Sequence, residues 1–348
     1  MILKPIILYI PSSVRTIDEE QWARIQSKFN IITYDCANTD EFIRRLQEPD
    51  GHYSKIQAII RTGWLKAEPF GNQKFFRGEV LQHFPPSLKL IAVGSHGYDA
   101  ADVAALTAMG VWYCNAPDTF TEAVANTALH LILNTFRYFT FAEHVTRAGR
   151  WDESRVLGKL AVDPSGQVLG IVGMGDIGIA IASRAVAFGM KVHYFNRRRL
   201  TSEREASVAG GAVYHSSLES LLRISDCICL ACPYTPETHH MLSTAQFELA
   251  KKQGLRVVNI ARGGLIDEAA LLKAMESGKV IGVGLDVHEN EPGINPALKD
   301  NYMTTVLPHF GVCSQTSWLR AEQVTFDNLE EFFYGGKNKP LTPVNHIS

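Results

Sequence analysis

The sequence predicts an α/β protein built on two doubly wound parallel sheets, one in each of two domains. Three observations lead to this fold class. The 348 residues suffice for two hydrophobic cores, and a content of 46% hydrophobic and 20% charged residues is ordinary for a globular protein. Along the chain, short apolar runs alternate with helical segments in two successive blocks. Strands that alternate with helices form a parallel sheet covered on both faces.

The first block occupies the N-terminal third of the chain. Apolar runs predict buried strands at 5–10, 57–62, 88–95 and 111–115. Helices are predicted at 18–29 and 100–109, the second ending before Gly110, where a glycine is favoured.

One long helix is predicted between the two blocks, at 118–149. Almost no glycine or proline interrupts this segment, and apolar residues occupy much of its circumference. A helix that is apolar on several faces must be buried on several faces. We therefore expect it to pack between domains or against a second subunit.

The second block repeats the alternation. Strands are predicted at 168–173, 191–196, 226–231, 255–261 and 280–287. The helices of this block are predicted at 177–188, 218–225, 244–253 and 267–277, followed by a last helix at 314–334. We expect the domain boundary near Pro117, which makes 118–310 one domain. The other domain is expected to comprise 1–117 and to be completed by 311–348.

Charge and hydropathy exclude several classes of protein. A net charge of −2 argues against a general nucleic-acid binder, which carries a basic excess. No uninterrupted apolar stretch reaches ~18 residues, so no membrane span is expected. No targeting segment is recognisable at the N-terminus, so we expect a cytoplasmic protein.

Three cysteines, Cys227, Cys229 and Cys232, form a C-x-C-x-x-C run that could in principle bind a metal. They lie in an apolar run that is predicted to be a buried strand, where residues alternate between the two faces. Cys229 and Cys232 then point to different faces. We expect reduced thiols in the core and no metal site.

A glycine-rich turn, Gly173-Met174-Gly175-Asp176-Ile177-Gly178, follows one predicted strand and opens the next helix. That context makes G-x-G-x-x-G a dinucleotide-binding motif. The first glycine permits the tight turn, the second lets the backbone approach a pyrophosphate, and the third lets helix and strand pack closely. The helix N-terminus stabilises the anion. The second block is therefore predicted to be a Rossmann domain.

The end of the next strand indicates which dinucleotide binds. An Asp or Glu at this point accepts hydrogen bonds from the ribose hydroxyls of NAD. Here the strand ends in Asn196, followed by Arg197, Arg198 and Arg199. The repelling carboxylate is absent and guanidinium groups can pair with a 2′-phosphate. We predict NADP(H), with NAD(H) bound at lower affinity, and leave open which of the three arginines reads the phosphate.

Arg262, Glu291 and His309 each follow a predicted strand of the second block. The carboxyl ends of parallel strands are where open α/β sheets bind ligands. A planar fork donor such as Arg262 suits the carboxylate and carbonyl of a 2-oxo acid. His309 suits the proton that the carbonyl oxygen takes up as hydride reaches carbon, and Glu291 would stabilise and orient that imidazole.

These motifs together resemble the D-isomer-specific 2-hydroxyacid dehydrogenases, a family that includes glyoxylate/hydroxypyruvate reductases, D-mandelate dehydrogenases and phosphoglycerate dehydrogenases. The similar segments are 169–178, 258–265, 284–292 and 308–311, and the resemblance extends from about residue 57 through the last helix. It implies that Arg262, Glu291 and His309 are the catalytic residues. It also implies a flavodoxin-like substrate domain and homodimers formed through the helix at 118–149.

The resemblance also assigns binding residues. The backbone N–H groups of Ser95, His96 and Gly97 would hold the substrate carboxylate together with Arg262, and Asp286 would bind the nicotinamide carboxamide. The other cofactor contacts it implies are Gly173, Gly175, Asp176, Ile177, Gly178, Asn196, Arg197, Arg198, Cys232, Pro233, Thr238 and Ile260.

The chain departs from the family at several positions. Asp176 stands where the family has a basic or small polar residue, and an acid there weakens phosphate binding unless it turns away. His96, Trp64 and Trp318 lie in segments that shape the substrate pocket. The leading expectation is reduction of glyoxylate and hydroxypyruvate, and the alternative is reduction of bulkier aromatic or branched 2-oxo acids.

Two further alternatives remain. Arg61 could meet a second anion on the substrate, as in the phosphoglycerate branch. A nucleotide-sensing corepressor, as in one branch of the family, is disfavoured because the chain has no long charged tails.

Overall fold

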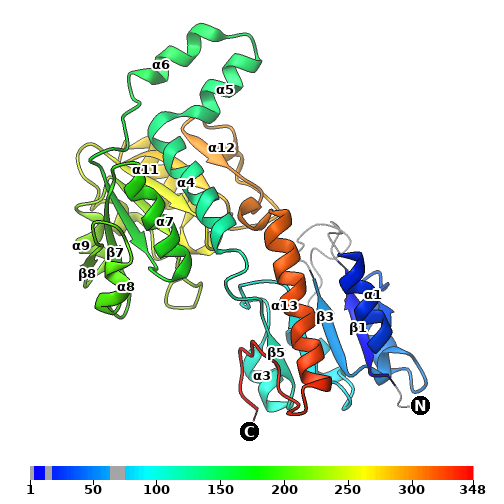
Figure 1. Cartoon of the computed structure of the whole chain (residues 1–348). Coiled ribbons are helices and arrows are strands. Elements are labelled where there is room, and N and C mark those ends of the chain that lie inside the picture. Colours follow the sequence, from blue (N-terminus) through cyan, green and yellow to red (C-terminus); the bar gives the residue numbers. More distant parts are fainter. Residues whose placement is uncertain (1–3, 12–17, 63–74, 348) are drawn as a thin grey trace. The chain divides into compact units, whose positions relative to one another are not determined.

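The computed structural model describes residues 4–11, 18–62 and 75–347. It divides into two compact units. Unit 1 comprises Met1–Phe120 and Cys313–Ser348, and unit 2 comprises Thr121–Val312. In Figure 1, unit 1 therefore contains both the blue and the red end of the chain.

Unit 1 is built on a parallel five-stranded sheet of order β2-β1-β3-β4-β5, the order of flavodoxin-like folds. Its strands are β1 (Ile6–Ile10), β2 (Asn30–Thr33), β3 (Ala58–Arg61), β4 (Leu90–Val93) and β5 (Trp112–Cys114).

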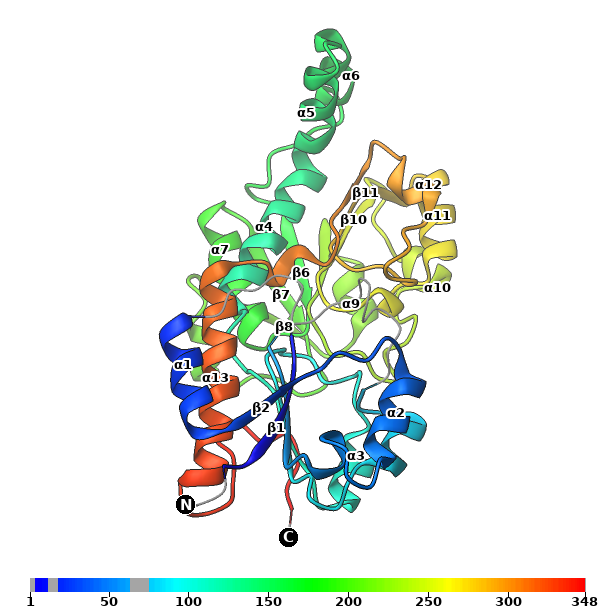
Figure 2. The ribbon, with the colours of Figure 1, turned by 90° about the vertical axis from the view of Figure 1, so that its right-hand side faces the viewer.

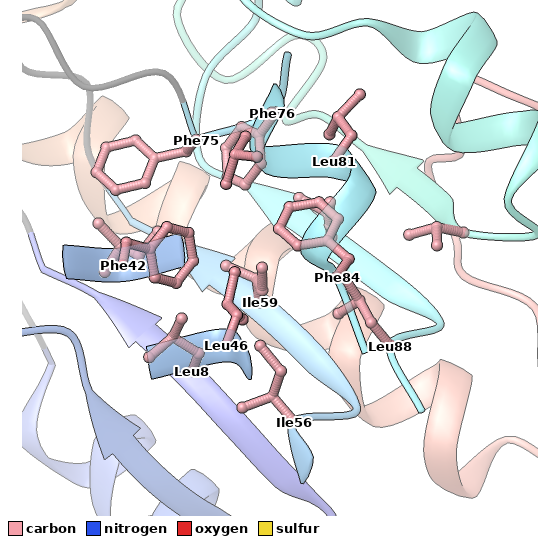
Figure 3. Close-up of a cluster of buried hydrophobic side chains, with 14 of the residues drawn as sticks. Leu8, Phe42, Leu46, Ile56, Ile59, Phe75, Phe76, Leu81, Phe84 and Leu88 are labelled. Atoms are coloured by element: carbon pink, nitrogen blue, oxygen red, sulfur yellow. The ribbon is translucent and has the colours of Figure 1, made fainter. Parts of the chain in front are cut away.

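Helices cover both faces of this sheet. Helices α1 (Glu19–Lys28) and α13 (Gln315–Tyr334) lie side by side on one face, where Trp22 contacts Phe326. On the other face, α2 (Thr39–Gln47) and α3 (Val103–Ala108) bury Phe42 and Leu106 against Leu8 and Ile59. Figure 3 shows this second core, and Figure 2 shows α2 and α3 on the same side of the sheet. Successive residues of β1 alternate between the two cores, as the pleat of a buried strand requires.

Unit 2 contains a parallel seven-stranded sheet of order β12-β11-β10-β9-β6-β7-β8. Its strands are β6 (Val168–Val172), β7 (Lys191–Phe195), β8 (Val213–His215), β9 (Cys227–Leu230), β10 (Leu255–Asn259), β11 (Val280–Leu285) and β12 (Thr304–Val306). The order runs outward in both directions from the neighbours β6 and β9, so the topological switch point of a Rossmann fold lies between them. The predicted fold class is confirmed for both units.

The helices of unit 2 also cover two faces. Helices α4 (Thr121–Arg137) and α7 (Asp176–Ala187) pack on one face, and α9 (Leu218–Leu222), α10 (Thr244–Phe247) and α11 (Glu268–Glu276) on the other. Short helices α6 (Ser154–Gly158), α8 (Ser202–Ala206) and α12 (Pro296–Lys299) also belong to this unit. Cys227 and Cys229 are buried in β9.

The long helix predicted at 118–149 is wrong as a single element. The structure has α4 and then α5 (Phe139–Arg147), separated by Tyr138 in the left-handed conformation at φ 53°. Two contacts explain the break. The Asn134 carboxamide accepts a hydrogen bond from the Thr140 N–H (2.9 Å), and the Tyr138 hydroxyl donates to the Ile281 carbonyl (2.9 Å). These bonds turn the chain, so that α5 and α6 extend away from the sheet of unit 2 (Figure 2).

Strands β2, β8 and β12, together with helices α2, α6, α8 and α12, are absent from the elements predicted above. All but α2, which has nine residues, are short, and a three- or four-residue strand shows too little of its alternation to be recognised. Within the described residues, no helix is both long and apolar enough to cross a bilayer.

Candidate active site

The glycine-rich turn joins β6 to α7 in the geometry that its three glycines predict. Gly173 has φ 99°, and a Cβ there would lie 2.6 Å from the nitrogen of Cys232, which follows β9. A Cβ on Gly178 would lie 2.4 Å from the Gly173 carbonyl oxygen. A Cβ on Gly175, by contrast, would have no atom of the described residues within 4 Å. The first and third glycines are required by packing, whereas the second exposes backbone that a pyrophosphate can approach.

Two side chains connect this turn to the segment after β7. The Met174 N–H donates to Oδ1 of Asn196 at 2.7 Å, so Asn196 supports the turn directly. The Asp176 carboxylate accepts a hydrogen bond from the Arg204 guanidinium, which lies on α8. The negative charge of Asp176, which should weaken phosphate binding, is therefore paired with the positive charge of Arg204. Nothing in the sequence pattern distinguishes Arg204, because it is an exposed arginine on a five-residue helix.

The three arginines after Asn196 differ in their surroundings. Arg199 bonds both carboxylate oxygens of Glu205, through Nε and Nη2 at 2.9 Å each. Arg197 and Arg198 are exposed, and within the described part of the chain neither forms a hydrogen bond or an ion pair. Of the three, Arg197 and Arg198 are thus the ones available to a ligand.

His309 and Glu291 lie in contact after β12 and β11. Nδ1 of His309 is 3.1 Å and 3.3 Å from the two carboxylate oxygens of Glu291. Their side chains are 14% and 8% exposed, so the pair is largely removed from water. The Glu291 carboxylate also accepts the His288 N–H at 3.0 Å, which holds it in place. The pair predicted from separate motifs is therefore assembled by the fold.

Arg262 follows β10 and is half-buried. Asn259 Nδ2 donates to the Arg262 carbonyl oxygen at 2.8 Å, and Nη1 of Arg262 donates to the Ala261 carbonyl at 2.7 Å. The next residue, Gly263, packs so closely on the following loop that a Cβ would lie 2.0 Å from the His288 carbonyl carbon. The Arg262 segment is thus pressed against the loop that carries Glu291.

Asp286 holds the segment that carries His309. Its backbone carbonyl accepts the His309 N–H (2.7 Å), and its carboxylate oxygens accept the N–H groups of Phe310 (2.6 Å) and Gly311 (2.8 Å). The side chain is buried, and this burial raises the pKa of Asp286, whereas the two N–H groups oppose the shift. The segment needs such support, because His309 has φ 57°, a strained value for a residue other than glycine.

A second network, which the sequence did not reveal, supports the same loops. His240 Nε2 lies 2.7 Å from Oε1 of Glu289, two residues before Glu291. The Tyr234 ring lies against Gly264, where a Cβ would be 2.9 Å from it. These contacts connect the loop after β9 to the loops of Arg262 and Glu291.

The other predicted cofactor residues border the same end of the sheet. Cys232 and Pro233 follow β9, and the Thr238 hydroxyl donates to the Pro233 carbonyl at 3.0 Å. Ile260 follows β10 and is buried. Their contacts with a cofactor remain predictions.

The predicted carboxylate loop belongs to unit 1. Ser95, His96 and Gly97 follow β4, where the Ser95 hydroxyl donates to the Gly97 carbonyl at 3.1 Å. The His96 carbonyl accepts a hydrogen bond from the Asn115 side chain at 2.7 Å. Arg61 ends β3, with its guanidinium 5.4 Å from the centre of the Phe75 ring. Trp318 is half-buried on α13, and Trp64 lies outside the described residues.

The comparison with known families decides the identity. Residues 129–311 match the family model described as D-isomer specific 2-hydroxyacid dehydrogenase, NAD binding domain. This chain belongs to that family. The dehydrogenase is therefore an oxidoreductase, and the resemblance stated from the sequence motifs is confirmed.

The similarity to named relatives extends over almost the whole chain of the dehydrogenase. A 4-methyl-2-oxopentanoate reductase A of Aspergillus oryzae is 36% identical over 93% of this chain and 94% of its own length. The structure is similar to holo D-mandelate dehydrogenase of Rhodotorula graminis, with a TM-score of 0.92, 33% identity and coverage of 100% of this chain and 99% of that chain. A glyoxylate reductase structure from Paecilomyes thermophila gives 0.87 at 34% identity, covering 98% of each chain.

Proposed function

We propose that this dehydrogenase reduces 2-oxo acids to D-2-hydroxy acids with NADPH, and that glyoxylate and hydroxypyruvate are its preferred substrates. The observation that carries the proposal is the buried pair of His309 and Glu291, in the same unit as the glycine-rich turn. A proton donor with its own carboxylate, at the carboxyl ends of strands that bind a dinucleotide, suits the reduction of a carbonyl. In this proposal unit 2 binds the cofactor.

The residues present fit NADP(H). The backbone at Gly175 is accessible, and α7 begins there with N–H groups that favour an anion. Asn196 replaces the acid that would repel a 2′-phosphate, and Arg197 and Arg198 are exposed beside it. We expect NADPH to be preferred over NADH, and replacement of both arginines by alanine to raise the KM for NADPH while leaving that for NADH nearly unchanged. Equal use of the two cofactors by the unmodified protein would contradict this choice.

Arg262, His309 and Glu291 have different roles in the proposed reaction. The bound cofactor supplies the hydride that reaches the carbonyl carbon. Arg262 holds the carboxylate and carbonyl oxygens of the substrate with its planar fork, and so presents one face of the carbonyl. Nδ1 of His309 faces Glu291, so the other ring nitrogen, Nε2, delivers the proton to the carbonyl oxygen. Glu291 stabilises the protonated ring before transfer and keeps its orientation afterwards.

A panel of 2-oxo acids tests the substrate class. We would measure kcat/KM with NADPH for glyoxylate, hydroxypyruvate, phenylglyoxylate and 4-methyl-2-oxopentanoate. Higher values for the first two support the proposal. A preference for the last two would support reduction of bulkier acids, the second candidate, which the similarity to D-mandelate dehydrogenase and to 4-methyl-2-oxopentanoate reductase A favours.

We also propose that the protein is a cytoplasmic homodimer. The α5–α6 region exposes large apolar side chains that a monomer would leave in water, Phe139, Trp151, Val156 and Leu160. Light scattering after gel filtration should give twice the mass of the 38.6 kDa chain. Replacement of Trp151 and Leu160 by Glu should give the monomer, and a monomeric unmodified protein would refute the dimer.

A further inference from the structure

Asp176 places a negative charge at the first turn of α7, beside the backbone that would receive a phosphate. The structure pairs this carboxylate with Nη2 of Arg204, and the two side chains are 62% and 45% exposed. An exposed ion pair contributes little to folding stability. Stability alone therefore gives little reason for an arginine at this position.

The neighbouring ion pair of Arg199 and Glu205 serves as a comparison, because its charged groups are paired within the protein. Both oxygens of Glu205 are bonded by Arg199, and the Tyr194 hydroxyl donates to the same carboxylate. These donors lower the pKa of Glu205 to about 2. Arg204, by contrast, uses one nitrogen on one oxygen of Asp176. Among the described residues its Nε and Nη1 have no hydrogen-bond partner, so part of its fork is available to another anion.

The position of Arg204 relates it to the ribose end of a dinucleotide. It lies on α8, which follows β7, and the end of this strand is where Rossmann domains recognise the ribose 2′ position. Two contacts join the glycine-rich turn to the β7–α8 segment, Met174 to Asn196 and Asp176 to Arg204. The exposed Arg197 and Arg198 lie between these two contacts along the chain. The fork of Arg204 is thus held between the glycine-rich turn and the segment after β7, which in Rossmann domains recognises the ribose 2′ position.

We propose that Arg204, positioned by Asp176, binds the 2′-phosphate of NADP(H) and selects this cofactor over NAD(H). The inference rests on the proposed use of NADPH and adds residues that the Asn196–Arg198 motif does not predict. A phosphate monoester is close to dianionic at neutral pH and accepts charge-assisted hydrogen bonds from a guanidinium. Asp176 orients the fork, and Arg204 in turn neutralises the acid that would repel the cofactor phosphates. NADH has no phosphate at this position and gains nothing from the fork.

Two isomeric nucleotides separate the 2′-phosphate from the pyrophosphate. Adenosine 2′,5′-bisphosphate and ADP have the same number of phosphates, and only the first carries one on the 2′ oxygen. We would measure their dissociation constants by calorimetry for the unmodified protein and for Arg204→Ala. Loss of a charge-assisted bond should weaken adenosine 2′,5′-bisphosphate and NADP⁺ by about tenfold or more. Binding of ADP and NAD⁺ should change less than about twofold. Equal weakening of both isomers, or of neither, would overturn the assignment.

A double-mutant cycle with Asp176→Asn separates phosphate binding from charge neutralisation. If Arg204 contacts the phosphate, Arg204→Ala still weakens adenosine 2′,5′-bisphosphate severalfold in the Asp176→Asn background. If Arg204 merely neutralises Asp176, the effect disappears there and the proposal is wrong. Arg223→Ala, at an exposed position after α9, is the matched control and should leave both isomers unchanged.

Failure of this inference is distinguishable from failure of the proposed cofactor. An unmodified protein that binds NADP⁺ no more tightly than NAD⁺ would overturn the cofactor choice, and the role of Arg204 with it. A protein that prefers NADP⁺ and keeps that preference after Arg204→Ala would overturn the role of Arg204 alone.

Discussion

Replacement of Asp286 by Asn tests how the segment of His309 is held. The carboxylate accepts two successive N–H groups, from Phe310 and Gly311, while its own backbone carbonyl accepts the His309 N–H. Asn offers one acceptor oxygen in place of two, and its amide NH₂ group would face one of the two N–H donors. The segment would then be free to leave the strained conformation of His309.

The size of the effect follows from these contacts. A hydrogen bond to a charged group contributes about 1.5–3 kcal/mol, and a buried donor left without an acceptor costs about 1–3 kcal/mol. Burial raises the pKa of Asp286, so the charge itself is costly to bury and its removal offsets part of the loss. We expect the free energy of unfolding to fall by about 1–3 kcal/mol. A displacement of His309 of about 1 Å should lower kcat by about 10²-fold.

Steady-state kinetics and urea unfolding at pH 7 check this prediction. If Asp286 acts through His309, kcat falls while the KM for NADPH changes little, and addition of His309→Ala lowers kcat no further than His309→Ala alone. Asp300→Asn, at an exposed position after α12, is the control and should behave as the unmodified protein. A raised KM for NADPH with unchanged kcat would refute this reasoning, and would instead support the predicted contact between Asp286 and the nicotinamide.

The other predictions concern the proposed catalytic residues and a histidine pair. His309→Ala should lower kcat by ~10²–10⁴-fold with cofactor affinity retained, by fluorescence titration. Glu291→Gln should lower kcat, because the imidazole loses the carboxylate that orients it and stabilises its protonated form, and an unchanged kcat would exclude Glu291 from the mechanism. Arg262→Lys should lose most activity because the bidentate geometry is lost, and chiral chromatography of the unmodified enzyme's product should give the D isomer. Burial lowers the pKa of His193 and of His215, whose nitrogens lie 3.0 Å apart, so the folded state binds fewer protons than the unfolded chain below about pH 6.5. Stability in urea should therefore fall from pH 7.5 to 5.5, and fall less in His215→Gln.

Much of the fold and the candidate site could be predicted because the determining signals are local. A strand buried on both faces is apolar along its length whatever its neighbours are, so β6, with the sequence VLGIV, was recognisable as a run. The glycines of the turn were equally recognisable, because a Cβ would clash at Gly173 and Gly178, whereas Gly175 leaves its backbone accessible. The three strands that were not predicted have three or four residues, and their pairing with longer neighbours defines them more than their own pattern does.

The sequence by itself determined the two α/β blocks, the dinucleotide turn and the types of residue at the strand ends. The tertiary structure decided which of these side chains meet. The break at Tyr138 depends on the carbonyl of Ile281, which lies 143 residues along the chain. Likewise, Arg204 reaches Asp176 across 28 residues, and Glu291 reaches His309 across 18. The last two contacts form because parallel strands bring distant loops to one edge of a sheet. The order of residues along the chain does not show which loops become neighbours. Local propensity does not specify the path by which the intervening helices connect the strands.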